Sequence, residues 1–188
     1  MKITNRFVLR ERTNEVHGRL EKAVGEFTDA RTYIRYLEGM RIFRQVVERD
    51  LPFTGAVATA DNWKPIAIAP LLRQDLEDLG RKTPCAAAMA FDLPSDREEL
   101  LGVLYVLEGS GLGARVLMRR AALLGFSSNY GARHLAVQAS RADSWNSLLK
   151  LLDEIASADI ERTVRAARMT FEAALHAFNS KDAPQVHP

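Results

Sequence analysis

One histidine near the amino terminus has neighbours at the spacing expected around a metal ligand. His17 lies in the segment RERTNEVHGRLE, with Thr13 four residues before it and Glu21 four residues after it. Residues four apart share one side of a helix, so a helix here would bring the three side chains together. Neutral imidazole binds iron, and its second nitrogen needs a partner that fixes the ring. The Glu21 carboxylate can supply that partner, directly or through water.

The segment YVLEGSGLGARV at 105–116 is the second feature with chemical meaning. Gly109, Gly111 and Gly113 interrupt an apolar run that otherwise favours a long helix. Glycine inside a helix costs about 0.5–1 kcal/mol relative to alanine. A chain that keeps three of them usually needs a kink, or needs something flat to approach the backbone closely. Together with the histidine, this pattern suggests two helices enclosing a planar cofactor.

The glycine segment allows other interpretations. Small residues also let another helix pack closely, and this alternative stays open. A dinucleotide-binding turn would need glycine at position 114, where the chain has Ala114, and no βαβ pattern surrounds it. A nucleophile elbow would need glycine two residues before Ser110, where Glu108 stands.

Thr13, His17 and Glu21, followed far downstream by LYVLEGSxLG at 104–113, carry a family resemblance. The chain resembles the heme oxygenases, in particular the bacterial branch that supplies biliverdin to phytochromes. The resemblance spans roughly the whole chain, and its specific part lies in these two motifs.

The resemblance implies an activity and partners. Haem would be both cofactor and substrate, opened at a meso carbon to biliverdin with release of iron and carbon monoxide. The reaction would use dioxygen and an external electron donor, a ferredoxin- or flavin-type reductase. A bacteriophytochrome that receives biliverdin would be a further partner.

The resemblance also assigns roles to residues of both motifs. His17 would be the proximal iron ligand, with Glu21 as the residue that orients it. Gly109 and Gly113 would contact the haem on the distal side and direct bound oxygen towards one meso edge. Ser110 stands where the animal enzymes carry an aspartate that organises water, an aspartate that the phytochrome-associated branch also lacks.

Cationic and aromatic residues complete the expected site. Arg10, two turns before His17, matches a basic position of the family and would anchor a haem propionate. A second anchor would come from the last helix, with Arg165 or its neighbours Arg162 and Arg168. Tyr105 and Phe171 are expected to line the pocket, although core packing or an exposed helix face is the plainer interpretation of such residues.

Three positions depart from the family pattern. Ser110 cannot carry charge, Asn14 replaces a lysine of the animal enzymes, and Ala114 replaces a common second glycine whose extra methyl would narrow the pocket. They motivate an alternative function, a haem- or bilin-binding protein that does not turn over. A third hypothesis is a helical interaction module without a cofactor, in which His17 only borders the core.

Composition limits the class of protein. The chain has 188 residues, 47% of them apolar and 27% charged, which fits one domain with a sizeable core. A net charge of +2 gives little support for nucleic-acid binding, and a single cysteine, Cys85, excludes an intrachain disulfide. We find no signal peptide and no apolar run long enough to cross a bilayer. A cytoplasmic protein is therefore expected.

Apolar periodicity predicts an all-α fold of six to eight helices, with one heme oxygenase-like domain over 1–180 and a frayed tail at 181–188. Asp29 is expected to cap the second helix, which Pro52 and Gly55 would end. Residues 56–70 are ambiguous, a short helix is expected over 71–79, and 81–94 is predicted as loop or irregular helix.

The second half of the chain is predicted as one long helix followed by two shorter ones. Ser95 and Glu98 form a capping box that would open the glycine-containing helix, which would run to Leu124 with Gly125 as its C-cap. Residues 126–140 are predicted as a loop. Two helices should follow, over 143–155 and 159–178, the latter capped by Ser157.

Overall fold

The computed structural model describes residues 4–51, 66–82, 90–140 and 142–180, and within these ranges it contains helices and no strand. The seven helices are α1 (Asn5–Val24), α2 (Ala30–Asp50), α4 (Ala69–Asp78), α5 (Arg97–Leu123), α6 (Arg133–Ala139), α7 (Ala142–Asp153) and α8 (Ile160–Asn179). The all-α prediction is confirmed.

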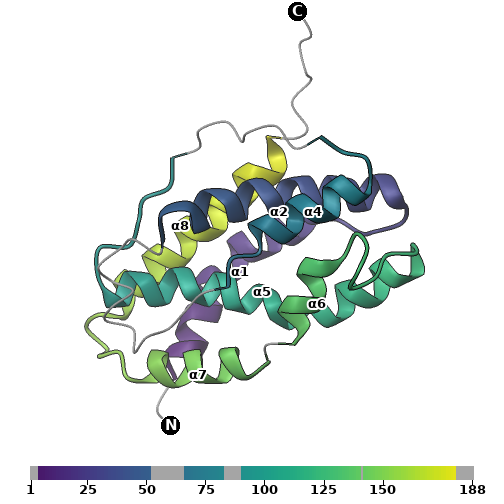
Figure 1. Cartoon of the computed structure of the whole chain (residues 1–188). Coiled ribbons are helices and arrows are strands. Elements are labelled where there is room, and N and C mark those ends of the chain that lie inside the picture. Colours follow the sequence, from purple (N-terminus) through teal and green to yellow (C-terminus); the bar gives the residue numbers. More distant parts are fainter. Residues whose placement is uncertain (1–3, 52–65, 83–89, 141, 181–188) are drawn as a thin grey trace, which may run out of the picture.

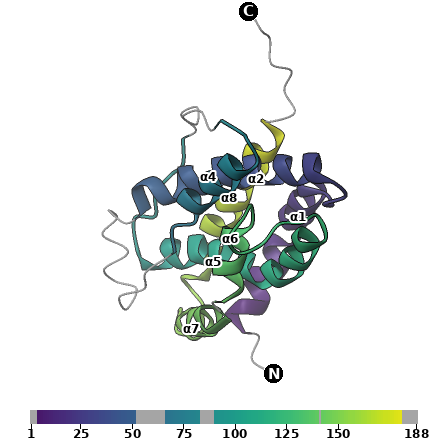
Figure 2. The same cartoon turned by 45° about the vertical axis from the view of Figure 1, so that its right-hand side comes forward.

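Helix α8 is the centre of the packing. It contacts α1, α2 and α5, while α5 also contacts α6 and α7, and α2 contacts α4. In Figure 1, α5 crosses the middle of the molecule with α2 and α4 above it and α7 below it. Figure 2 shows the same order after the turn, with α1 to one side of α5. One end of α5 lies in a core cluster with α7 and α8, and its other end in a cluster with α2, α4 and α6.

Helix ends follow local chemistry where the capping residues are adjacent in sequence. The Asp29 side chain accepts a hydrogen bond from the Thr32 backbone N–H, and the Thr32 hydroxyl oxygen accepts one from the Asp29 backbone N–H. This capping box confirms the predicted start of α2. Helix α2 ends at Asp50, and Leu51 is its C-cap. Pro52 and Gly55, predicted to end α2, lie outside the described residues.

The long helix α5 begins one residue later than predicted. Asp96, not Ser95, is its N-cap and accepts from the Glu99 N–H, while Glu99 accepts from the Ser95 N–H and hydroxyl. At the other end Gly125 has a φ of 88°, and the Phe126 N–H reaches back to the Ala121 carbonyl. The helix ends at Leu123 with Leu124 as its C-cap, one residue earlier than predicted, and Gly125 follows in the left-handed conformation that stops it.

Three further predictions about elements were wrong. Residues 126–140 are not all loop, because α6 occupies Arg133–Ala139. Helix α4 begins at Ala69, with Pro70 in its first turn where a missing N–H costs nothing. Asp159, not Ser157, is the N-cap of α8, and it makes no side-chain capping bond. The predicted tail at 181–188 and most of the ambiguous segment 56–70 lie outside the described residues.

A glycine that was not singled out in the sequence sets the crossing of α5 and α8. A Cβ added to Gly102 would lie 2.3 Å from the Thr163 carbonyl oxygen and 2.9 Å from the Ala166 Cβ. Those separations are below any real contact, so only glycine permits this approach of the two backbones.

Among the described helices, α5 alone is long and apolar enough to cross a membrane by length and composition. A single helix of this kind is weak evidence for a membrane span. The core helix of a soluble protein passes the same test, and α5 buries side chains such as Leu100, Leu101 and Leu104 against other helices.

Candidate functional site

A cavity of about 500 Å³ opens between α1 and α5, a size that suits a small-molecule ligand. Helices α7 and α8 contribute one aromatic residue each, Trp145 and Phe171. Seven of the nine predicted site residues line it: Arg10, Thr13, His17, Glu21, Tyr105, Gly109 and Ser110. The fold therefore brings together two motifs that are almost a hundred residues apart in sequence.

His17 projects from α1 into this cavity and remains half exposed. The edge of its ring meets the Phe171 ring at a centroid distance of 5.4 Å and an angle of 83°. Its Nδ1 lies 3.6 Å from Glu21 Oε1, just beyond a direct hydrogen bond. A water molecule or a small rotation would link the two, which leaves Nε2 as the free nitrogen. Glu21 and Phe171 thus restrict the ring from two sides.

Tyr105 and Thr13 meet across the cavity wall. The Thr13 hydroxyl is buried and donates to the Leu9 carbonyl oxygen at 2.7 Å. Burial raises the pKa of Tyr105, although its hydrogen bond with Thr13 and the positive charges of Arg6 and Arg10 act in the opposite direction. Tyr105 therefore stays a neutral phenol, and its hydrogen goes to the Thr13 oxygen because the Thr13 hydrogen is already bound to Leu9.

Two arginines, Arg6 and Arg10, give the cavity a cationic side. They lie one turn apart on α1, and the structure shows no ion pair with a described residue for either of them. The Arg6 guanidinium lies 6.0 Å from the centre of the Trp145 ring, within the range of a cation–π contact. Sequence reasoning missed Arg6 and Trp145. The four-residue step from Arg6 to Arg10 was a signal that could have revealed Arg6.

The wall formed by α5 is helical through its glycines, from Arg97 to Leu123 without interruption. A Cβ added to Gly109 would lie 3.5 Å from the Trp145 ring, and one added to Gly111 would lie 3.5 Å from the Gln138 carbonyl oxygen. Both are ordinary contacts. A Cβ added to Gly113 would meet nothing within 4 Å. Unlike Gly102, none of these glycines is required by the packing of the described residues.

Gly113 is exposed on α5 and does not line the cavity; it lies one turn beyond Gly109, which does. Two large apolar residues flank it, Leu112 at 54% exposure and Val116 at 49%. This stretch of helix therefore combines open backbone with exposed apolar side chains, as a surface that receives a flat apolar ligand would.

Ala114 is buried in the core cluster formed with α2, α4 and α6. The expectation that its methyl narrows the pocket was wrong, because Ala114 faces the other side of α5. Asn14 does line the cavity. Its amide thus takes a place on the wall beside the cations of α1.

Arg165 lies away from the cavity. It pairs with Glu99 at 2.9 Å, near the start of α5, and lines a separate surface hollow. Arg162 pairs with Asp96, and Arg168 points to the Arg12 carbonyl oxygen. The arginines of α8 are thus not brought together with His17. The second arginine on the cavity wall, beside Arg10, is Arg6.

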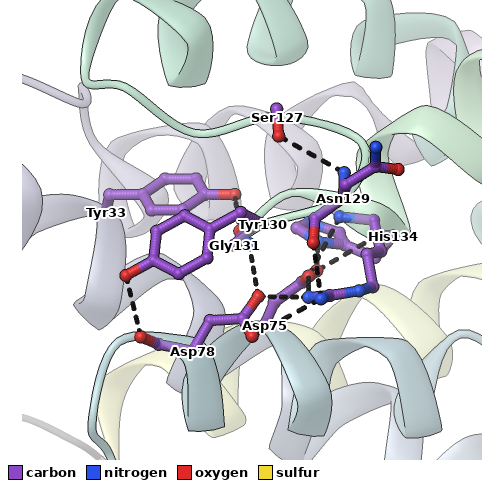
Figure 3. A network of polar contacts seen from close by, with 9 residues as sticks. Tyr33, Asp75, Asp78, Ser127, Asn129, Tyr130, Gly131 and His134 are labelled. Atoms are coloured by element: carbon purple, nitrogen blue, oxygen red, sulfur yellow. Dashed lines mark hydrogen bonds and ion pairs between the residues drawn. The ribbon is translucent and has the colours of Figure 1, made fainter.

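A buried polar network holds α6 against α4 (Figure 3). Both oxygens of Asp75 accept hydrogen bonds from the first backbone N–H groups of α6, at Arg133 and His134. His134 Nδ1 lies 2.7 Å from Asp75, and its Nε2 lies 3.2 Å from the Tyr36 hydroxyl. His134 was predicted in a loop and is instead buried in α6. The described residues contain no group of three or more His, Cys, Asp and Glu side chains that could hold a metal.

Burial decides the charge states in this network. Burial lowers the pKa of His134, and this outweighs the opposing effect of Asp75, so the imidazole is neutral. Burial alone would raise the pKa of Asp75, but hydrogen bonds from His134 and from the backbone of Arg133 outweigh it, so that the pKa is lowered. A neutral His134 therefore donates from Nδ1 to an ionised Asp75 and accepts from Tyr36.

Comparison with known proteins agrees with this architecture. The heme oxygenase family model matches residues 6–180. The chain is 33% identical over 174 residues to heme oxygenase PigA of Pseudomonas aeruginosa, a match that covers 89% of this chain and 84% of that protein. A crystal structure of the NO- and CO-bound heme oxygenase from Neisseria meningitidis superposes with a TM-score of 0.73 at 26% identity, covering 99% of both chains. The chain belongs to the heme oxygenase family.

Proposed function

We propose that this protein degrades haem to biliverdin, iron and carbon monoxide, and that the α1–α5 cavity is where it acts. The observation that carries the proposal is the meeting of a half-exposed histidine with a glycine-rich helix face across one cavity. Family membership supports haem degradation in general. When bound, haem supplies the oxygen chemistry, and the protein supplies binding, orientation and exclusion of water.

The donor set fits haem as the substrate. His17 Nε2 is the nitrogen left for iron, because Nδ1 faces Glu21 and the ring edge rests on Phe171. A Cβ added to Gly113 would have no atom within 4 Å, so the backbone there leaves room for a flat ring system. The apolar side chains of Leu20 and Val106 line the same cavity and suit a porphyrin face.

The cationic side of the cavity suits two carboxylates. Arg10 and Arg6 would each pair with a propionate, and guanidinium is well matched to carboxylate geometry. The neutral phenol of Tyr105 lies on the same wall as these arginines. Thr13 accepts the phenol hydrogen, because its own hydrogen is donated to the Leu9 carbonyl oxygen, and this bond fixes the direction of the phenol.

The distal wall would be formed by Gly109, Ser110 and Gly113. Glycine backbone at contact distance restricts how a small ligand tilts, and this restriction would select the meso carbon. Ser110 provides a hydroxyl oxygen without charge, and its hydrogen already binds the Leu107 carbonyl oxygen at 2.6 Å. Proton supply would therefore come from ordered water and not from an acidic side chain.

The proposal includes partners and a location. Electrons would come from a ferredoxin- or flavin-type reductase, and a bacteriophytochrome would receive the biliverdin. A cytoplasmic location is supported by the use of a single cysteine, which suits a reducing compartment.

A titration with hemin followed by reduction in air tests the proposal. Purified protein should give a saturable Soret band that decays, on addition of ascorbate or a reductase, into the broad red absorption of biliverdin. A Soret band that forms and persists would instead identify a haem carrier. Without saturable binding, the proposal would fail altogether.

A further inference from the structure

Ser110 has a partner on a second helix, which limits what its hydroxyl offers to the cavity. Its Oγ donates to the Leu107 carbonyl oxygen at 2.6 Å and accepts from Gln138 Nε2 at 2.9 Å. A hydroxyl has one hydrogen and two lone pairs. These two bonds use the hydrogen and one lone pair. The remaining lone pair makes Ser110 an acceptor towards the cavity.

Gln138 reaches Ser110 from behind the cavity wall. It lines a separate cavity of about 110 Å³, together with Arg44, Glu108 and Arg115, and this cavity adjoins the larger one at Leu112 and Trp145. Ser110 lines the larger cavity, and among the described residues Gln138 is not part of that lining. The hydrogen bond between them therefore links a residue behind the lining to a residue within it. Through this bond Gln138 can act on a ligand in the larger cavity.

Gln138 lies on α6, and the polar network around Asp75 and His134 holds this helix in place (Figure 3). Asp75 binds the first N–H groups of α6, and the His134 ring is held between Asp75 and Tyr36. Gln138 lies four residues after His134, on the next turn of the same short helix. Its amide therefore approaches Ser110 from a helix that packs against α5 and is also held to α4 by Asp75.

We propose that Gln138 is a positioning residue for the distal side of the haem site: its amide holds the Ser110 hydroxyl so that the cavity faces an acceptor. This inference rests on the proposed function. A fixed acceptor favours a distal ligand that brings its own hydrogens. It therefore favours water over hydroxide on ferric haem, and it raises the midpoint pH of the acid–alkaline transition of the complex.

The test compares four variants with the wild type. Gln138→Leu keeps the volume but removes the donor, Ser110→Ala removes the acceptor, and a third variant combines both changes. Gln74→Leu on the exposed face of α4 is the matched control. In the haem-free protein, ¹H–¹⁵N NMR of the Gln138 side-chain amide should change on Ser110→Ala. In the ferric haem complex, absorption spectra give the midpoint of the acid–alkaline transition.

Each single change at Gln138 or Ser110 should lower that midpoint by about 0.5–1 pH unit, the size of one lost hydrogen bond. The double variant should lower it no further than Ser110→Ala, because the amide acts through the hydroxyl. The Gln74→Leu control should change neither the midpoint nor the haem affinity.

Three outcomes would overturn the role of Gln138: an amide resonance indifferent to Ser110→Ala, a midpoint unmoved by Gln138→Leu, or an effect of Gln138→Leu that persists in the Ser110→Ala background. Failure of the proposed function looks different. In that case the wild type and the Gln74→Leu control would both lack a saturable Soret band, and the role would fall with it.

Discussion

His17 is oriented by residues that come from different parts of the chain. Glu21 lies one turn along the same helix and could be predicted from spacing, whereas Phe171 comes from α8 and meets the ring edge. The Glu21 carboxylate and the Phe171 ring both lie against the His17 ring and leave its Nε2 free. The sequence was informative where partners are four residues apart. It also placed Phe171 in the pocket, but it gave no sign of Trp145 or Gln138, which come from other helices.

Changing His17 to alanine should remove the strong ligand field of bound haem while leaving the fold nearly unchanged. The side chain is half exposed, so the free energy of unfolding should change by no more than about 0.5 kcal/mol. Hemin spectra with and without added imidazole, together with urea unfolding, check both parts. An unaltered haem spectrum would show that the ligand is another residue.

Arg10→Ala should weaken haem binding by about fivefold, because an exposed guanidinium–carboxylate contact contributes on the order of 1 kcal/mol. Arg12→Ala is the matched control on the same helix, since Arg12 pairs with Glu161 on the outer side. Fluorescence quenching during hemin titration gives both affinities. Equal losses in the two variants would argue against a specific propionate contact at Arg10.

Helix α5 contains two kinds of glycine, which the sequence does not distinguish. Gly102 lies against the α8 backbone, whereas Gly113 faces open space. Where a cap is local, the predicted helix boundary was right at Asp29 and within one residue at both ends of α5. The helix α6 was missed because its cap is Asp75, which is distant in sequence, so no local signal marks its start.

The contrast between the two glycines gives opposite expectations. Gly113→Ala should stabilise the haem-free protein by about 0.5–1 kcal/mol, because alanine favours a helix and nothing lies in its way. Gly102→Ala should destabilise it by several kcal/mol, since its Cβ would collide with the Thr163 carbonyl. Thermal unfolding of both variants measures this. A destabilised Gly113→Ala protein would mean that the helix needs glycine there for its own packing.

Gly113→Leu extends the comparison to function. A bulky side chain over the cavity edge should hinder dioxygen or carbon monoxide binding to the reduced haem complex more than it hinders haem binding itself. Stopped-flow carbon monoxide binding and a hemin titration separate the two effects. Equal loss of both would identify Gly113 as a packing residue.

At the scale of the whole molecule, two core clusters share α2 and α5, and the network of Asp75 and His134 lies in the one that contains α4 and α6. Charged and titratable groups surround His134, namely Asp75, Arg44 and Tyr36, with Asp78 and Arg133 beside them. The sequence suggested the fold class from periodicity alone. This network could not be foreseen, since its members come from three helices.

Stability should fall as the pH is lowered from 7.5 to 5. The pKa of His134 is below its ordinary value of 6.5 in the folded protein, so the unfolded chain binds more protons below that pH. Urea unfolding should therefore show a loss of up to about 1.4 kcal/mol per pH unit. His176→Ala, on an exposed residue, should keep the slope. A stability that is flat between pH 7.5 and 5 would contradict a neutral buried His134.

The capping of α6 by Asp75 has a consequence for the order of folding. A seven-residue helix is too short to persist in water, and the N-cap residue of this one, Ala132, makes no side-chain capping bond. Its first N–H groups find their acceptor only when α4 has docked and brought the Asp75 carboxylate to them. The Gln138 amide reaches Ser110 only on a formed α6. The distal wall is thus complete only when α4, α5 and α6 have packed together, whereas Glu21 reaches His17 from within a single helix.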